Sequence, residues 1–374
     1  MQLIKDHINQ PMFQFEFRGR PFKLQRYPQS NNRSLVPVSA AQAYLLRLLE
    51  EGELPITEQP LIYNDRFGAW ALALSGWQPQ LVPNYASQKK AWTKNCLLNG
   101  LDLDQLNYCL PLAQAKACSQ AFMLVPKSMD LFELQLQQAH LALKEDGSIH
   151  AAFMTRHFTP SMLQLAQKYF EQVEQSRAWK KARILSMRGK KPLAGQALTR
   201  SIYYESDSYQ QYYGVFSAKQ VDKGSRFFIE NWLVQEEEGQ LLDLACGNGI
   251  LAHQYLKRAP KMQAQLTDDA YLAIASSQLN LPDTPAVWTD ELSHIPAGSL
   301  DLVLSNPPFH FGHENNIEVS LGLFQAVKPL LKPNGSMQIV ANRHLNYSSH
   351  LERIYARVDC LAQNLAFEVL RVEL

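Results

Sequence analysis

Residues 241–250 read LLDLACGNGI, an apolar run that stops at a glycine-rich turn and resumes as the start of a helix. The run is short and continuous, which is typical of a strand buried on both faces of a parallel sheet. The same order of strand and then helix recurs along the chain, as at residues 61–74, 122–143 and 302–331. Strands that alternate with helices in this way predict an α/β fold with mostly parallel, doubly wound sheets.

The length and composition of the chain suggest two domains in a cytoplasmic protein. Its 374 residues carry 36 basic and 35 acidic side chains, with 46% hydrophobic residues, so two domains of ordinary globular composition are expected. A net charge of +1 means that any nucleic-acid surface must arise from local clustering. There is no apolar run of signal-peptide or membrane-spanning length. We expect a monomeric, cytoplasmic protein with no membrane partner.

The cysteines and histidines do not indicate a metal site. The five cysteines are scattered and never spaced C-x-x-C, which argues against both a zinc site and a disulfide framework. His310, His313 and Glu314 give H-x-x-H-E, which is not the order found in zinc proteases. We expect no metal, and we expect His310, which directly follows Phe309, to contact RNA instead.

A second stretch, residues 300–309, reads LDLVLSNPPF and carries the chemistry. Proline cannot donate to a sheet ladder, so the strand ends at Asn306, at the edge where open α/β sheets bind ligands. Pro307 and Pro308 make the turn stiff, and the Asn306 amide oxygen and the Pro307 carbonyl can accept both hydrogens of an exocyclic amine. Phe309 can stack on the ring that bears it. Acceptors placed out of the amine's plane favour its localised lone pair, which is what alkyl transfer requires.

The glycine loop leaves two cofactors to distinguish. With three further residues it satisfies G-x-G-x-x-A, so a dinucleotide must be considered, and Asp268 at the end of the next strand suits a ribose in either case. Asp243 would repel a pyrophosphate, whereas S-adenosylmethionine has no phosphate and carries an ammonium group. Asp290, after the third strand, is placed to accept from an adenine amine. We therefore expect S-adenosylmethionine.

The two halves of the chain repeat one pattern. Residues 143–158 read LKEDGSIHAAFMTRHF and residues 331–345 read LKPNGSMQIVANRHL. A constant offset of 181 residues aligns Gly68 with Gly249 and Pro126 with Pro307. Two copies of one fold are therefore predicted. At that offset Val125 corresponds to Asn306, Lys127 to Pro308 and Arg66 to Gly247, so the first copy is expected to be non-catalytic.

A basic segment separates the copies. Residues 177–200 hold eight basic residues and no acidic one, with Trp179 among them. Such a run supplies phosphate contacts without reading sequence, although a solvated linker is the alternative. We expect a degenerate first domain at 1–185, a basic linker and hairpin at 186–212, and a catalytic domain at 213–374.

These motifs carry a resemblance. D-x-x-C-G-N-G followed by a strand-terminal NPPF resembles the class I S-adenosylmethionine-dependent methyltransferases that modify exocyclic amines. With the tandem arrangement, GVFSAKQVDKGSRFF at 214–228, SNPPFH and ANRHL, the chain is similar to the ribosomal RNA guanine-N2 methyltransferases of the RsmC/RlmG type. The chain length, VPK at 125–127 and AWKKARIL at 178–185 are most similar to the RlmG branch.

The resemblance implies methyl transfer to N2 of a guanine in 23S ribosomal RNA, with an inactive amino-terminal copy that assists RNA binding. Three sets of residues follow from it and from the residue patterns. The catalytic candidates are Asn306, Pro307, Pro308 and Phe309. The cofactor candidates are Asp243, Cys246, Gly247, Asn248, Gly249, Asp268, Asp269, Asp290 and Asn306. The RNA candidates are Phe216, Phe309, His310, Lys180, Lys181, Arg183, Lys190 and Lys191.

Other readings remain open. The same turn serves 16S guanine N2, adenine N6 and protein glutamine N5 methylation, and the basic segment argues against a protein substrate. A non-catalytic ribosomal RNA-binding assembly factor is a further alternative.

One departure from the family pattern is Ala245, where such loops often carry glycine, and we expect it to be tolerated without an unusual φ.

Overall fold

The computed structural model describes residues 3–5, 11–29, 35–102, 104, 106–193, 198–235, 237–307, 310–311, 314–315 and 317–374. Its contacts divide the chain into two compact units, Met1–Gln196 and Ala197–Leu374. Within the described residues, no helix is both long enough and apolar enough to cross a membrane.

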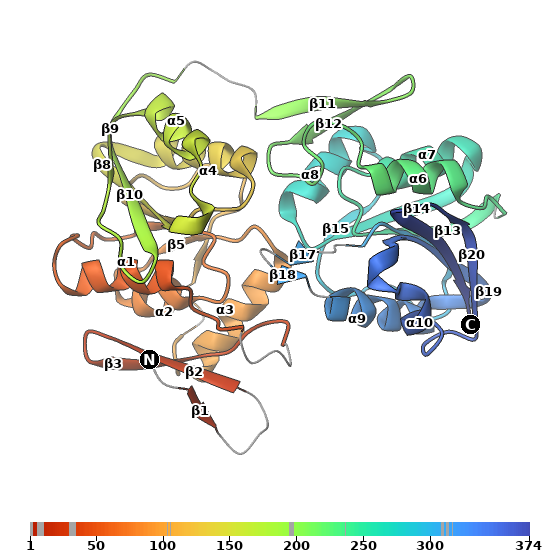
Figure 1. Ribbon diagram of the computed structural model, residues 1–374, viewed down its shortest axis with the longest axis horizontal. Helices are drawn as coiled ribbons and strands as arrows, with labels where there is room; N and C mark the ends of the chain where they lie inside the picture. The colour runs from red at the N-terminus through yellow and green to blue at the C-terminus, as the bar shows by residue number, and fades with distance from the viewer. Residues whose placement is uncertain are drawn as a thin grey trace. The chain divides into compact units, whose positions relative to one another are not determined.

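The first unit is built on a seven-stranded sheet with the order β6-β5-β4-β7-β8-β10-β9. Figure 1 labels β5, β8, β9 and β10 of this sheet. Five strands are parallel, whereas β10 runs antiparallel to both of its neighbours. The strands are β4 (Leu61–Tyr63), β5 (Gln80–Val82), β6 (Asn107–Tyr108), β7 (Cys118–Leu124), β8 (Leu143–Met154), β9 (Phe170–Gln175) and β10 (Ala182–Lys190).

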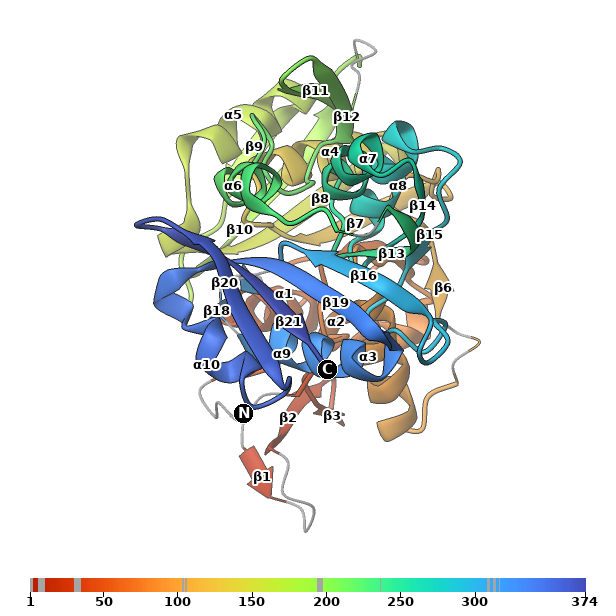
Figure 2. The same cartoon turned by 90° about the vertical axis from the view of Figure 1, so that its right-hand side faces the viewer.

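The second unit repeats this sheet in the order β15-β14-β13-β16-β19-β21-β20. Its first five strands are again parallel, and β21 runs antiparallel to β19 and β20, as the neighbouring strands in Figure 2 show. The strands are β13 (Glu238–Leu244), β14 (Lys261–Asp268), β15 (Ala286–Trp288), β16 (Leu300–Ser305), β19 (Leu331–Asn342), β20 (Arg357–Gln363) and β21 (Phe367–Glu373). The identical order and direction confirm the predicted α/β class and the duplication of the fold.

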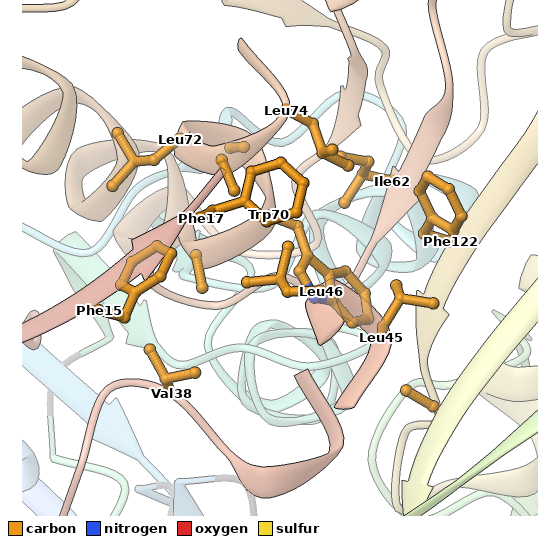
Figure 3. Packing of buried hydrophobic residues seen from close by; sticks show 14 of the residues in the cluster. Phe15, Phe17, Val38, Leu45, Leu46, Ile62, Trp70, Leu72, Leu74 and Phe122 are labelled. Carbon is orange, nitrogen blue, oxygen red and sulfur yellow. The ribbon is translucent and has the colours of Figure 1, made fainter. Parts of the chain in front are cut away.

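Helices cover both faces of the first sheet. On one face α1, α2, α3 and the hairpin β2–β3 pack around Trp70, which lies among Leu45, Leu46 and Ile62 in Figure 3. On the other face α4 and α5 bury Phe132, whose neighbours come from β4, β7 and β8. The elements are β1 (Leu3–Lys5), β2 (Pro11–Phe17), β3 (Arg20–Leu24), α1 (Ala40–Glu50), α2 (Ala69–Ala73), α3 (Ala86–Leu98), α4 (Met129–Ala142) and α5 (Pro160–Tyr169).

The second sheet is covered in the same way. One face packs on α6, α7 and the hairpin β11–β12, and the other packs on α9 and α10. Helix α8 packs beside β14. The elements are β11 (Thr199–Tyr204), β12 (Asp207–Tyr212), α6 (Lys223–Asn231), α7 (Ile250–Arg258), α8 (Tyr271–Asn280), β17 (His310–Phe311), β18 (Glu314–Asn315), α9 (Ile317–Val327) and α10 (Tyr347–Leu351). Single 3-10 turns lie at Ser75–Trp77, Thr155–His157, Lys328–Leu330 and Arg343–Leu345.

The predicted basic linker is wrong in its first part. Residues 182–190 form β10 between β8 and β9, because Ala182, Ile184, Leu185 and Met187 are buried in the sheet. The expected boundary at residue 185 therefore falls inside a strand, and the division between the units lies after Gln196. The residues from 199 to 212 form the hairpin β11–β12.

The predicted correspondence of Val125 with Asn306 is wrong by one residue. Gly68 and Gly249 occupy equivalent helix starts, which aligns Ile62 with Asp243 at the offset of 181. Ile62 pairs with Phe122, however, whereas Asp243 pairs with Leu304, so the next strand is shifted by one. Leu124 therefore stands where the second unit has Asn306. The conclusion that this position lacks an amide is unchanged.

Candidate active site

The loop after β13 contains three residues with positive φ. Ala245 has φ 60°, Gly247 has φ 58° and Gly249, which starts α7, has φ 81°. The expectation that Ala245 needs no unusual φ is wrong, since a Cβ at this φ is crowded by its own backbone. A Cβ built on Gly247 would meet no atom within 4 Å, so among the described residues its outer face is open to a ligand.

Asp243 supplies a buried carboxyl at the start of this loop. The residue is 0% exposed, and its Oδ2 accepts from the backbone nitrogen of Ala252 at 3.0 Å. Its Oδ1 is buried and has no hydrogen-bond partner among the described residues. Burial, with a smaller contribution from Asp268, raises the pKa of Asp243 to about 7. An orphaned carboxylate oxygen of this kind fits the ammonium group of S-adenosylmethionine.

Asp268 holds the loop from the neighbouring strand. One carboxylate oxygen accepts from the backbone of Gly247 at 3.0 Å and the other accepts from the backbone of Ala270 at 2.8 Å. Burial raises the pKa of Asp268 to about 6, although these two donors lower it. A carboxylate has about four acceptor positions, so Asp268 can hold the loop and still accept from ribose hydroxyls.

The remaining cofactor candidates differ in what their side chains contact. Cys246 is buried with Ala252, Leu266 and Ile274, so its sulfur faces the core. Burial raises the pKa of its thiol. The Asn248 amide donates to Gln211 Oε1 of β12 at 2.9 Å, which ties the loop to the hairpin.

Asp269 and Asp290 flank the ends of the next two strands. The Asp269 carbonyl accepts from Trp288 Nε1 at 2.7 Å. The backbone nitrogen of Thr289 donates to the Asp268 carbonyl at 3.0 Å. The sheet edge therefore brings Asp290 next to the Asp268 strand end, as expected for parallel neighbours.

Asn306 directly follows β16, the strand beside β13. Ser305 pairs with Leu244 and its hydroxyl donates to the Leu244 carbonyl at 2.7 Å, so the Asn306 turn and the glycine loop leave adjacent strands. The Asn306 amide nitrogen donates to Asp222 Oδ2 at 3.1 Å and to Ser225 Oγ at 2.8 Å. Its Oδ1 is buried and no described residue donates to it. Pro307 is buried beside it.

Several predicted residues are not described. Pro308, Phe309 and His313 lie outside the described residues, and only the backbone of His310 is described, in β17. Among the residues whose side chains are described, no three His, Cys, Asp or Glu residues are grouped as a metal site.

The segment before α6 joins the two loops, and sequence reasoning had noted only its aromatic residue. Phe216 is 66% exposed, which leaves its ring accessible. Gln211, which bonds Asn248, also donates to the Ser217 carbonyl at 3.3 Å. Asp222, a few residues on, bonds Asn306. Gln211, Asp222 and Ser225 were not predicted, because their partners lie 37 to 84 residues away along the chain.

The five basic candidates separate into two groups. Lys180 and Lys181 are exposed in the turn between β9 and β10, where the Lys180 ammonium lies 4.5 Å from the centre of the Trp179 ring. The others are engaged within the first unit. Arg183 donates to Gln175 Oε1, Lys190 donates to the Leu143 carbonyl and Lys191 donates to the Gln167 carbonyl.

In the first unit, the equivalent strand ends are filled by protein amides. Asn64, at the position of Ala245 and with φ 61°, donates to the Leu124 carbonyl and to Gln135 Oε1, both at 2.7 Å. The Asn64 oxygen in turn accepts from Asn84 and from Gln135. Asp65, 0% exposed, accepts from the backbone of Trp70 and Ala71 at the start of α2. The polar groups of these side chains are therefore engaged within the first unit itself.

Both halves of the chain match known families. Residues 12–191 match a model described as the RLMG N-terminal domain, and residues 209–371 match one described as the methyltransferase small domain. A Pectobacterium atrosepticum protein named ribosomal RNA large subunit methyltransferase G is 32% identical over 375 residues, covering 96% of this chain and 98% of its own. A Yersinia enterocolitica protein of the same name is 33% identical over 369 residues, covering 94% and 91%.

A solved structure has the same fold across both halves. It is described as the T. thermophilus 16S rRNA N2 G1207 methyltransferase (RsmC) in complex with AdoMet and guanosine. Its TM-score to this chain is 0.74 at 21% identity, with 97% of each chain covered. The likeness shows that the two tandem Rossmann-like units form a known architecture.

Proposed function

Because the chain belongs to the ribosomal RNA large subunit methyltransferase G family, we propose that it methylates the exocyclic N2 amine of a guanine in 23S ribosomal RNA. The methyl donor is S-adenosylmethionine, which when bound supplies a methyl group on a positively charged sulfur. Since ribosomal RNA is the substrate, we propose a cytoplasmic location. We propose separately that the enzyme is a monomer.

The observation that carries this proposal is the state of the Asn306 amide. Its nitrogen is held by Asp222 and Ser225, whereas its buried oxygen has no donor among the described residues. A buried acceptor without a partner costs about 1–3 kcal/mol, which an amine N–H would relieve. Asn306 lies one strand from the glycine loop, so a held amine would face the cofactor side of the sheet edge.

The residues of the second unit divide the task. When S-adenosylmethionine is bound, Asp243 would pair with its ammonium group, and Asp268 and Asp290 would accept from its ribose and adenine. The backbone at Cys246, Gly247, Asn248, Gly249 and Asp269 would lie along it. Asn306 Oδ1 and the Pro307 carbonyl accept from the guanine amine. As that nitrogen gains positive charge, these acceptors stabilise it. The amine proton then leaves to water, so no strong base is required.

The guanine must leave any duplex to reach this site. Flipping a base costs a few kcal/mol, which stacking on an aromatic ring offsets in part. The exposed Phe216 offers one such ring, and Phe309 and His310 remain candidates beside the turn. The first unit serves for packing and RNA contact, through Lys180 and Lys181 near Trp179.

The experiment is methylation of unmodified 23S ribosomal RNA by the full chain, with the product nucleosides identified by mass spectrometry. The proposal expects N2-methylguanosine in 23S RNA and little in 16S RNA or ribosomal protein. N6-methyladenosine, a methylated 16S product or a methylated glutamine would each show a different substrate. Absence of any product, together with failure to bind S-adenosylmethionine in calorimetry, would indicate a non-catalytic RNA-binding factor.

A further inference from the structure

We propose that Asp222 and Ser225 are positioning residues that lock the Asn306 amide with its oxygen toward the amine. This inference rests on the proposed function of Asn306 as the amine acceptor. It adds that the acceptor is oriented by a second element, the start of α6, which lies 81 to 84 residues earlier in the chain.

The need for orientation follows from the chemistry of an amide. Its two ends have nearly the same shape, but one accepts hydrogen bonds and the other donates two. A flipped Asn306 would present N–H groups to the N–H groups of the substrate. No described residue donates to Asn306 Oδ1, so among the described contacts only those of Nδ2 select the productive orientation.

Asp222 selects this orientation, and the Ser225 hydroxyl, which can accept or donate, adds a second contact to Nδ2. An ionised carboxylate accepts only, so it attracts Nδ2 and would repel Oδ1 in the flipped state. Asp222 Oδ2 is 3.1 Å from Nδ2, and Ser225 Oγ is 2.8 Å from it. Ser225 is 7% exposed, so water competes weakly for its hydroxyl. Holding a reactive group in its attack geometry can change rates by about 100-fold for a displacement of 1 Å.

The first unit supports the inference that the carboxylate at the start of α6 serves the amide at the end of β16. Helix α1, which likewise precedes the first central strand of its sheet, has Ser39 at its N-cap and Gln42 at its third position. The Gln42 side-chain nitrogen donates to Asp65 Oδ1 at 2.9 Å. Leu124 is the residue at the strand end that matches Asn306. Where the amide is missing, the carboxylate that would orient it is also missing.

Asp222 has a second role that the test must separate. Its Oδ2 also accepts from the Ser225 backbone at 3.0 Å, which caps α6. Serine caps helices about as well as aspartate does, but its shorter side chain would not reach Asn306. Asp222→Ser therefore keeps the cap and removes the contact. Asp222→Asn keeps both acceptor contacts and removes the charge, and Ser225→Ala leaves the backbone cap in place.

Turnover, cofactor affinity and melting temperature are measured for the wild type, D222N and the double variant D222S/S225A. The double variant should lose about 10- to 100-fold in kcat, with cofactor Kd within about twofold and a melting temperature within several degrees of the wild type, because the Asn306 amide nitrogen loses both of its acceptors. D222N should stay within about fivefold of wild-type kcat, since a neutral acceptor gives about half the hydrogen-bond strength.

A double variant with wild-type kcat would overturn the proposal, and so would an equal loss of turnover and cofactor affinity. Exchange of the Asn306 side-chain amide protons, followed by NMR, supplies a readout that needs no activity. Exchange should be faster in the double variant, and equal rates would also overturn the proposal. Failure of the wild type to methylate RNA would instead refute the proposed function.

Discussion

At the scale of the residue, the Asp243 carboxyl links stability to pH. Burial raises its pKa to about 7 in the folded protein, far above its ordinary value. The folded state therefore binds this proton more tightly than the unfolded state does. Its contribution to stability is present below about pH 4 and is lost as pH rises through about 7.

Replacement of Asp243 by Asn should remove that dependence. We expect the free energy of unfolding of cofactor-free D243N, relative to wild type, to rise by about 1–3 kcal/mol between pH 5 and pH 8. Denaturant titrations at both pH values measure this difference. If the free energies of unfolding of the two proteins changed with pH in parallel, the raised pKa of Asp243 would be contradicted. The same variant should bind S-adenosylmethionine more weakly at pH 8.

Ala245 offers a second residue-scale test. Its φ of 60° costs an L-residue roughly 1–2 kcal/mol, whereas a glycine there loses about 0.5–1 kcal/mol through the greater freedom of the unfolded chain. Ala245→Gly should therefore be neutral or stabilise the protein by up to about 1 kcal/mol, with cofactor binding retained. A thermal melt measures the change, and a clear loss of stability would contradict the claim that the backbone at Ala245 is strained.

At the scale of the element, strands with periodic apolar residues could be predicted, whereas contacts between distant segments could not. The strand and turn at 302–307 and the glycine loop followed from proline and glycine chemistry. β10 was missed because its buried residues Ala182, Ile184, Leu185 and Met187 do not alternate strictly and stand among basic residues that resemble a linker. Asp222 and Ser225 read only as a helix start, since nothing in the local sequence points to Asn306.

The β9–β10 turn carries the element-scale prediction. Lys180→Gln with Lys181→Gln should weaken ribosomal RNA binding and reduce its salt slope by about 2, if each lysine meets one phosphate. Binding titrated against salt concentration measures both. The matched control is Lys190→Gln with Lys191→Gln, because those ammonium groups donate to Leu143 and Gln167 carbonyls. An equal loss of RNA affinity in both variants would contradict a specific role for the turn.

At the scale of the whole molecule, two copies of one sheet have diverged in chemistry while keeping the same strand order. The second copy has open space at Gly247 and two buried oxygens, Asp243 Oδ1 and Asn306 Oδ1, with no donor among the described residues. The first copy fills the same strand ends with Asn64 and its amide partners. One cofactor per chain is therefore expected.

The most direct test of this account combines calorimetry and turnover on full-length Asn306→Ala. The variant should bind S-adenosylmethionine with a stoichiometry of about one and a Kd within about threefold of wild type, since Asn306 contacts the amine. Its methyl transfer to 23S RNA should fall by at least about 100-fold, as when a main transition-state contact is removed. Turnover close to that of the wild type would contradict the central role of the Asn306 turn, and a stoichiometry of two would contradict a filled first copy.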